Sequence, residues 1–311
     1  MDQENIVSAI RKIGIPGNRN FVPYYTSNSW NGEHDSFYFF SVEPGSFKPA
    51  LYLYDVTEDS FKKCFDLNFC KNDTDVKRLI FTVFLIRRGL MICFCDNQLI
   101  EVDLKTGEQN VKFSFGKELL FDGCCVSEDE RYYCFGTTAN AEKTPTKVQI
   151  IDTTLPEWKE ICTRTIDMHA NHFQFFRNGK DILFAHEGVT TGIPDRLNLL
   201  NWETGEIRCL HWHIHDENGK QIECIGHEHI AGDKVLAVRY PDSQMDFGII
   251  VVDPETGDFE LVDRGDYWHS ASNQNGTKFV MDTMWWANSR RKIPGLVDVI
   301  LFDAENKKRH I

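Results

Sequence analysis

Short apolar segments alternate with polar turns along the whole of the 311-residue chain. Within a segment the apolar positions recur every second residue, which is typical of β-strands with one buried face. Segments of this kind repeat with a period of about 50 residues, and in each period one strand ends in an Asp or Asn that is followed by a turn and another strand. These anchor residues are Asp55, Asp103, Asp152, Asn201, Asp253 and Asp303. The pattern predicts six tandem repeats.

A second strand lies upstream of each anchor and is introduced by a polar turn, as in RNGKDILFAHEG and NQNGTKFVMDT. Turns such as D-x-x-T-G and N-G join hairpins, because Asn and Gly accept the positive φ that tight turns need. Four short strands per repeat indicate a propeller blade. We expect an all-β fold, a single β-propeller domain over residues 1–311, with repeats at approximately 20–67, 68–118, 119–165, 166–216, 217–265 and 266–311. The only helical pattern is an amphipathic turn around Ile6 to Ile13.

Composition narrows the class of protein. Hydrophobic residues make up 41% of the chain and charged residues 26%, as in a globular protein. The net charge of -13 argues against nucleic acid and membrane surfaces as partners, since both are negatively charged. The N-terminal segment has no apolar stretch typical of a signal peptide, so a cytoplasmic protein is expected. The ten cysteines are then predicted to be reduced, buried thiols, with zinc at Cys93 and Cys95 the weaker alternative.

Histidines are concentrated in the second half of the chain, where ten of the eleven lie between residues 169 and 310. His172, His227 and His269 each precede the polar turn of their own repeat by a similar number of residues. We therefore expect these histidines, and the segment around Phe21, to lie on innermost strands. The three imidazoles should then converge at the mouth of the propeller channel. The alternative is that a wet, polar channel merely tolerates histidine there.

Two further aromatic groups have less specific patterns. The segment LHWHIH contains three histidines at strand spacing, His211, His213 and His215. We expect them to form an exposed polar face, with a metal site as the less favoured alternative. Trp285 and Trp286 are candidates for stacking on a sugar ring, although packing between blades is the more frequent role of tryptophan in a propeller.

Several segments, taken in order, resemble the oligogalacturonate lyase family of seven-bladed propeller enzymes. The matching segments are NRNFVPYY, LIEVDLKTGE, FAHEG followed by a D-R pair, GHEH and HSASNQNGTKFVMDT. No single string is specific, but their order and spacing extend over almost the whole chain. The resemblance implies cleavage of oligogalacturonate, an acidic oligosaccharide, by β-elimination at a uronic acid during pectin degradation.

The resemblance also implies roles for particular residues. Carried over by position, the family's catalytic arginine falls on Arg196 and its catalytic histidine on His227. The histidine that ligates a divalent metal, usually manganese, falls on His269. Substrate-binding roles are expected for His172, His186, Glu187 and Glu228.

The sequence departs from the family in three respects. The remaining metal ligands of the family, one Gln and two His, come from a Q-x-x-H-x-H segment on the last blade, which is absent before the chain ends at Ile311. One imidazole does not hold a catalytic ion, so we expect manganese to bind weakly or not at all. His229 and Ile230 replace aromatic residues that follow GHE, so the substrate subsite is expected to differ. Six repeats instead of seven predict either an open gap or a tightened ring.

The chemistry requires a base for the proton on C5 of the sugar and a cation beside its carboxylate. His227 is the expected base, since an imidazole titrates near neutral pH, and Arg196 is the expected carboxylate partner because its forked donors match two oxygens. A locally positive channel mouth would offset the net negative charge, and its candidates are Arg177, Arg196, Arg239, Arg290 and Arg291. The alternative hypothesis is a non-catalytic propeller that binds an acidic sugar or a protein partner.

Overall fold

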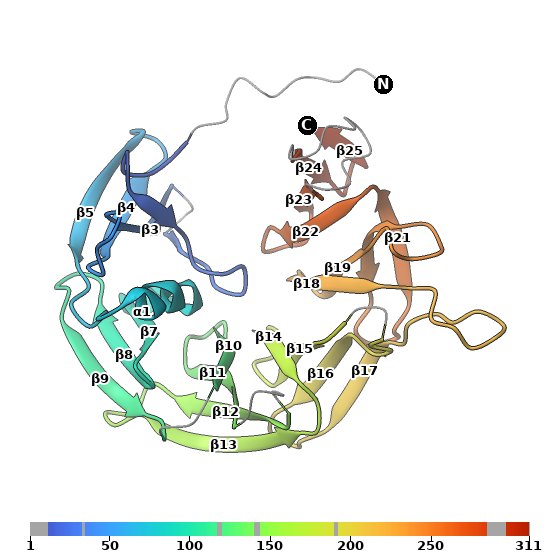
Figure 1. Cartoon of the computed structure of the whole chain (residues 1–311), viewed down its shortest axis with the longest axis horizontal. Coiled ribbons are helices and arrows are strands. Elements are labelled where there is room, and N and C mark those ends of the chain that lie inside the picture. Colours follow the sequence, from blue (N-terminus) through green and yellow to red (C-terminus); the bar gives the residue numbers. More distant parts are fainter. Residues whose placement is uncertain are drawn as a thin grey trace. The chain divides into compact units, whose positions relative to one another are not determined.

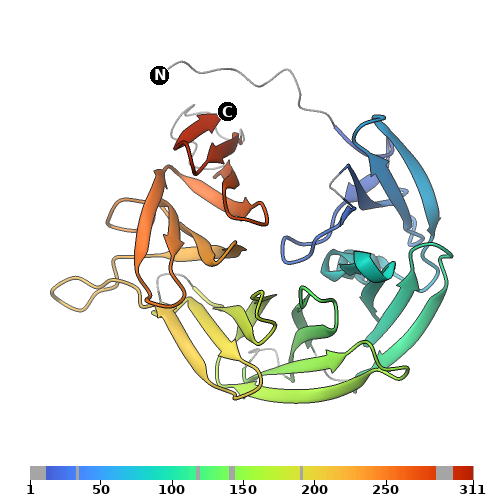
Figure 2. The same ribbon diagram turned by 180° about the vertical axis from the view of Figure 1, so that it is seen from behind.

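The computed structural model describes residues 12–32, 35–116, 120–139, 144–189, 192–284 and 297–310, without the side chains of 120–122. The chain divides into two compact units, an N-terminal unit of residues 11–165 and a C-terminal unit of residues 166–311, with residues 1–10 grouped with the latter. Each unit contains three antiparallel sheets that lie side by side (Figure 1; Figure 2, from behind). Most of the amphipathic turn expected around Ile6 to Ile13 lies outside the described residues.

The N-terminal unit contains the first three sheets. The first sheet comprises β1 (Arg19–Phe21), β2 (Trp30–Asn31), β3 (Ser36–Val42), β4 (Ala50–Asp55) and β5 (Ser60–Asp66). The second comprises β6 (Val83–Leu85), β7 (Leu90–Cys95), β8 (Gln98–Asp103) and β9 (Gln109–Ser114). The third comprises β10 (Leu120–Val126), β11 (Tyr132–Thr138), β12 (Thr146–Asp152) and β13 (Lys159–Ile166). The helices α1 (Asp73–Arg78), η2 (Leu79–Phe81) and η3 (Ile86–Arg88) are short. In the ranges described, no helix has the length and apolar character needed to cross a membrane.

The C-terminal unit contains the other three sheets. The fourth comprises β14 (Ala170–Phe175), β15 (Asp181–His186), β16 (Leu197–Asn201) and β17 (Ile207–His211). The fifth comprises β18 (Ile225–Ala231), β19 (Lys234–Arg239), β20 (Gly248–Val252) and β21 (Phe259–Arg264). The sixth comprises β22 (Tyr267–Ser272), β23 (Lys278–Thr283), β24 (Val299–Asp303) and β25 (Lys308–His310).

These sheets confirm the predicted all-β fold of six propeller-type repeats. In the second to sixth sheets the strands follow chain order, the order in the first sheet is β1-β3-β4-β5, and Phe21, His172, His227 and His269 all lie on first strands. The first sheet differs from the expected four strands, because β2 adds a fifth strand by pairing with β3. The single domain, the closure of the ring and the seven blades of the family stay predictions.

The anchor residues owe their periodicity to a local hydrogen bond. Asp103 Oδ1 accepts from the backbone N–H groups of Lys105 and Thr106 at 2.9 and 2.7 Å. Bonds of the same type fix the turn after β4, β12, β16, β20 and β24, with acceptors on Asp55, Asp152, Asn201, Asp253 and Asp303. An Asp or Asn side chain that bonds to the backbone two or three residues later stabilises such a turn. The hairpin between the third and fourth strands therefore selects the same residue type in every repeat.

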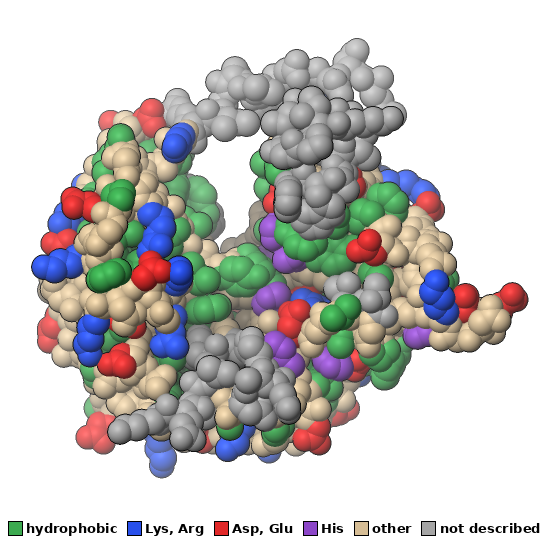
Figure 3. Space-filling model, viewed as in Figure 1, with side chains coloured by type: hydrophobic (Ala, Val, Ile, Leu, Met, Phe, Trp, Pro, Cys, Tyr) green, Lys and Arg blue, Asp and Glu red, His purple; other side chains and the backbone are tan. Residues whose placement is uncertain are grey.

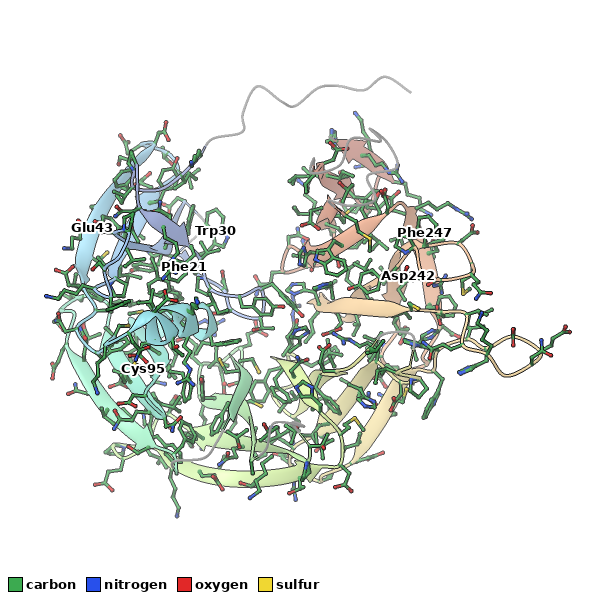
Figure 4. The ribbon with its side chains drawn as sticks, viewed as in Figure 1. Phe21, Trp30, Glu43, Cys95, Asp242 and Phe247 are labelled. Atoms are coloured by element: carbon green, nitrogen blue, oxygen red, sulfur yellow. The ribbon has the colours of Figure 1, made fainter. Side chains whose placement is uncertain are left out.

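Apolar layers between neighbouring sheets form the core of each unit. In the N-terminal unit, Phe40 packs with Met91 between the first and second sheets, and Phe94 packs with Tyr133 between the second and third. Phe21 extends the first layer from β1, with its ring centroid 5.4 Å from that of Phe40 (Figure 4). All ten cysteines are free thiols, and seven of them are buried, as predicted. Burial raises the pKa of the Cys93 thiol to about 12, which makes it unreactive.

The C-terminal unit is built in the same way. Leu183 and Val235 contribute to the layer between the fourth and fifth sheets, and Val238 and Met281 to the layer between the fifth and sixth. Each layer draws on alternate residues of its strands, as the period-two pattern predicts. This stack of sheets sets β14, β18 and β22 beside one another.

A buried polar cluster around Glu223 lies in the C-terminal unit and corrects the prediction made for the histidines of LHWHIH. His211 and His213 are only 7% and 3% exposed, so the exposed polar face expected for them is wrong, whereas His215 is exposed as expected. His211 Nε2 lies 2.7 Å from Oε2 of fully buried Glu223, and Arg239 Nε donates to Oε1 at 2.6 Å. Burial opposes the charge on Glu223, but His211 and Arg239 outweigh it and lower the pKa of the carboxyl. His211 turns inward because the buried carboxylate of Glu223 needs partners, whereas His213 contacts the side chain of Gln221 through Nδ1 at 2.7 Å.

Removal of the Glu223 carboxylate tests this cluster. Glu223→Ala leaves Arg239 buried without its counter-charge, so the free energy of unfolding in urea should fall by about 3–5 kcal/mol. The double variant Glu223→Leu with Arg239→Met should recover most of the loss. As a control, Glu203→Ala breaks an exposed ion pair with Lys180 and should change the free energy by less than about 0.5 kcal/mol. Equal stability of the Glu223→Ala and wild-type proteins would contradict a stabilising role of the pair.

Candidate functional site

A β-bulge interrupts the first strand of each sheet in the C-terminal unit. The pairing of β14 with β15 shifts between Asn171 and Gln174, and the equivalent strands shift after Gly226 and Tyr267. Two residues therefore oppose one at each bulge: His172 and Phe173 in β14, His227 and Glu228 in β18, Trp268 and His269 in β22. Bulges are frequent beside functional sites because they redirect side chains.

Two of these histidines have a backbone conformation that favours glycine. His172 and His227 adopt φ angles of 56° and 49°. The bulge in β10 of the N-terminal unit also contains a residue at positive φ, Gly123 at 98°, but there it is the second residue of the bulge and its lack of a Cβ removes the steric cost. Left-handed conformations of other residues cost about 1–3 kcal/mol and are concentrated at functional sites. His172 and His227 are therefore candidates for a functional role.

Glu228 is fully buried and connects two neighbouring strands. Its Oε1 lies 2.6 Å from His172 Nδ1, and its Oε2 accepts from Arg196 Nε at 3.1 Å. Burial opposes its charge, but Arg196 and then His172 outweigh burial and hold the pKa of Glu228 well below its usual range. Arg196 also contacts Glu187 Oε2 through Nη1 at 3.1 Å. Burial lowers the pKa of the guanidinium, but Glu228 and Glu187 outweigh burial and raise it above its usual range. Glu228 and Arg196 are therefore ionised at neutral pH.

Side chains also hold the three first strands together. Gln174 Nε2 donates to the carbonyl of Glu228 at 3.0 Å, and its Oε1 accepts from the backbone N–H of Ile230 at 3.1 Å. On the other side, Ser270 Oγ donates to the carbonyl of His227 at 3.3 Å. β18 is thus fixed between β14 and β22.

An aromatic group lies on the β22 side of this network. The ring centroids of His227 and His269 are 4.3 Å apart. Burial, followed by the charge of His269, lowers the pKa of His227 to about 4, so His227 is neutral at neutral pH. Its Nδ1 atom is buried and has no hydrogen-bond partner among the described residues. Asp282 orients His269 twice, by accepting from its backbone N–H at 2.7 Å and by lying 2.8 Å from Nδ1.

The histidine positions agree only in part with the sequence-based prediction. His172 and His227 are equivalent, since each is the first residue of its bulge, but His269 is the second residue of the bulge in β22. Counting back from the turn missed this one-residue offset. The residue of β22 that corresponds to His172 and His227 is Trp268, which the sequence analysis did not select.

The other expected site residues lie around Arg196. Glu187 is 29% exposed and accepts from Asn171 Nδ2 at 3.0 Å. His186 lies at the end of β15, with Nδ1 2.7 Å from Asp195 Oδ1, and its carbonyl accepts from Arg196 Nη1 at 3.5 Å. Histidines and carboxylates gather along the edges of β14, β18 and β22 in Figure 3. Full burial of Glu228 gives it contact with its neighbours and not with a ligand.

The expected positive field does not come from the buried arginines. Arg196 is matched by Glu187 and Glu228, and Arg239 is matched by Glu223. Arg177 is exposed and donates to the carbonyl of Gln274 at 2.9 Å. The remaining candidates, Arg290 and Arg291, lie outside the described residues, as do Trp285 and Trp286.

The side chains around His269 do not provide the ligands that the expected manganese requires. His269 and Asp282 contact each other, but the described residues contain no group of three or more His, Cys, Asp or Glu side chains able to hold a metal ion. These residues therefore do not fit a manganese centre.

Acid should weaken the C-terminal unit. Burial is the main cause that lowers the pKa of His213, His227 and His229 to about 4 each, against about 6.5 in an unfolded chain. Between these values the unfolded chain binds protons that the folded chain does not, so the free energy of unfolding should decrease as pH falls from about 6.5 to about 4. Urea unfolding at several pH values measures the slope. His213→Leu should make the slope shallower by up to about 1.4 kcal/mol per pH unit, and an unchanged slope would contradict the neutral, buried state of His213.

The strained histidines predict an unusual order of stability. His227→Ala retains a Cβ at a left-handed φ, whereas His227→Gly removes it, so the glycine variant should be about 0.5–1 kcal/mol more stable than the alanine variant. Urea unfolding compares the two, with the same substitutions at His269, where φ is not left-handed, as the control. An alanine variant at position 227 that equals or exceeds the glycine variant would disprove the strain.

Comparison with known proteins gives a structural relationship without a sequence relationship. No protein-family model matches the chain, and neither does any curated protein. An oligogalacturonate lyase in complex with manganese is similar in structure, with a TM-score of 0.75 and 17% identity over 95% of this chain and 78% of the lyase.

Two further solved structures are similar to this chain. An oligogalacturonate lyase from Vibrio parahaemolyticus has a TM-score of 0.72 and 17% identity, covering 94% of this chain and 78% of its own. A puromycin hydrolase has a TM-score of 0.59 and 13% identity, covering 96% of this chain and 47% of its own. The resemblance found in the sequence is thus supported in three dimensions, and the chain has the fold of the oligogalacturonate lyases.

Proposed function

We propose that this protein is a lyase-like propeller that cleaves oligogalacturonate, or a closely related acidic oligosaccharide, by β-elimination. The observation that carries the proposal is the placement of the His227 and His269 rings 4.3 Å apart, beside the buried Arg196–Glu228 pair. The fold shared with oligogalacturonate lyases over 95% of the chain supports the same assignment.

His227 is the proposed base. Its lowered pKa keeps the imidazole unprotonated at neutral pH, which a base requires, although a less basic imidazole accepts a proton with less driving force. In the proposed step the base takes the proton from C5 of the uronic acid, and that electron pair forms the C4–C5 double bond. The C4–O4 bond breaks, and the departing oxygen takes up a proton.

Arg196 is the proposed carboxylate partner in this step. Its Nε and Nη1 atoms contact Glu228 and Glu187, so only Nη2 lacks an acceptor among the described residues. The N–H groups of one nitrogen are a weaker recognition element than the fork of two nitrogens expected from the sequence. Glu187, His172 and His186 are proposed to bind hydroxyl groups of the sugar, and Glu228 to hold Arg196 and His172 in place.

A non-catalytic propeller that binds an acidic sugar or a protein partner is the second candidate. The observation that favours it is the neutralisation of Arg196 by two carboxylates, which leaves little positive charge to stabilise a developing carbanion. Sugar binding without formation of an unsaturated product would support this candidate over the lyase.

Replacement of two residues tests the proposed chemistry. His227→Ala should abolish the absorbance increase of an unsaturated uronate product and leave oligogalacturonate binding largely unchanged, because a base contributes in the transition state. Arg196→Lys should lower turnover at least about 10-fold, since a point charge cannot contact Glu228 and Glu187 together. His215→Ala, in the loop that follows β17, is the matched control and should retain wild-type turnover. Full turnover of His227→Ala would eliminate the proposed base.

The metal dependence provides a separate prediction. If His269 is the main protein donor, manganese should bind weakly, and a chelator should change neither the circular dichroism spectrum nor any lyase activity. Calorimetric titration with manganese measures the affinity, with His269→Ala as the comparison. Tight binding by the wild-type protein that depends on His269 would show that donors outside the described residues complete a metal centre.

A further inference from the structure

We propose that Trp268 is a stacking platform for one pyranose ring of the ligand. The identity of this ring as a uronic acid rests on the proposed function, whereas the platform itself rests on the geometry around β22. A tryptophan stacks on the C–H face of a sugar and does not require a charge on it, which suits a site whose arginines are already paired.

Strand register is the first support. His172, His227 and Trp268 each occupy the first position of the bulge in three adjacent first strands. The first two are half-buried imidazoles held in strained conformations. Trp268 is half-buried as well and occupies the corresponding position in β22, without the left-handed φ.

Ring contacts are the second support. The indole of Trp268 packs beside both imidazoles, with ring centroids 5.2 Å from His227 and 5.7 Å from His269. The rings meet the indole edge-on, at interplanar angles of 60° and 76°. A sugar on the indole would therefore lie within reach of the proposed base.

A buried tyrosine supports the platform from behind. Tyr240 is 5% exposed, and its ring centroid is 5.4 Å from that of Trp268. It packs so closely on β18 that a Cβ added to Gly226 would lie 2.6 Å from Tyr240 Oη. The glycine that precedes His227 therefore has a steric role, since it admits the tyrosine on which the indole packs.

The platform would orient the substrate as well as bind it. Stacking fixes the plane of a ring, and aromatic contacts contribute about 0.5–1.5 kcal/mol beyond burial alone. Orientation of a sugar ring beside His227 determines which C–H bond faces the imidazole. Trp268 is thus assigned as a substrate-positioning residue that contacts the ligand directly.

Intrinsic fluorescence tests the assignment in the full chain. Titration of the wild-type protein with digalacturonate, and separately with the neutral disaccharide lactose, should change the emission, and Trp268→Phe should remove most of that change. By calorimetry, Trp268→Phe should bind digalacturonate within about 3-fold of wild type, and Trp268→Ala about 5- to 10-fold more weakly. Trp212→Ala is the matched control, because Trp212 is 64% exposed on a loop of the same unit, and it should behave as wild type.

The outcomes separate the platform from the proposed function. Unchanged digalacturonate affinity of a folded Trp268→Ala variant would overturn the platform, as would the absence of an emission change with both sugars. Binding through Trp268 without an unsaturated product would overturn the lyase proposal alone. Gly226→Ala should displace Tyr240 and weaken binding in the same direction as Trp268→Ala; a folded variant with wild-type affinity would contradict the supporting role of the tyrosine.

Discussion

The charge on Glu228 is the constraint on which the arrangement of the candidate site depends. The carboxylate has no exposure to solvent, so its stability requires partners on both oxygens, and His172 and Arg196 provide them from the neighbouring sheet. Arg196 is buried in turn and needs a second carboxylate, which Glu187 supplies. Burial of Glu228 therefore determines the position of Arg196, and burial of Arg196 determines the position of Glu187, which is partly exposed.

This dependence explains why the site residues come from consecutive repeats. A buried ion pair is costly unless both partners are fixed, and the fixed elements here are first strands joined by Gln174 and Ser270. The same pairing limits what the site can do, because a guanidinium that neutralises two carboxylates has little charge left for a third. Recognition through an aromatic surface is compatible with that limit.

Much of the fold was predictable from the sequence, for reasons that are local. The Asx turn at Asp103 depends on four consecutive residues, so the anchor recurs wherever the same hairpin recurs. The site was predictable only to the level of its residues. His227, Arg196 and Glu228 were selected, but the burial of Glu228, the inward turn of His211 and the role of Asp282 depend on contacts between strands far apart in sequence. Trp268 was missed because a bulge changes the register by one residue, which no count along the chain reveals.

The bulge in β22 also has an evolutionary consequence. Where two residues oppose one, the strand already accommodates an extra residue, and loss of one residue between Tyr267 and Ser270 would restore regular pairing without moving the sheet. If the lost residue were Trp268, His269 alone would lie between Tyr267 and Ser270, and an imidazole would stand where the bulge now begins with an indole. A single codon thus separates two surfaces of different chemistry on the same strand.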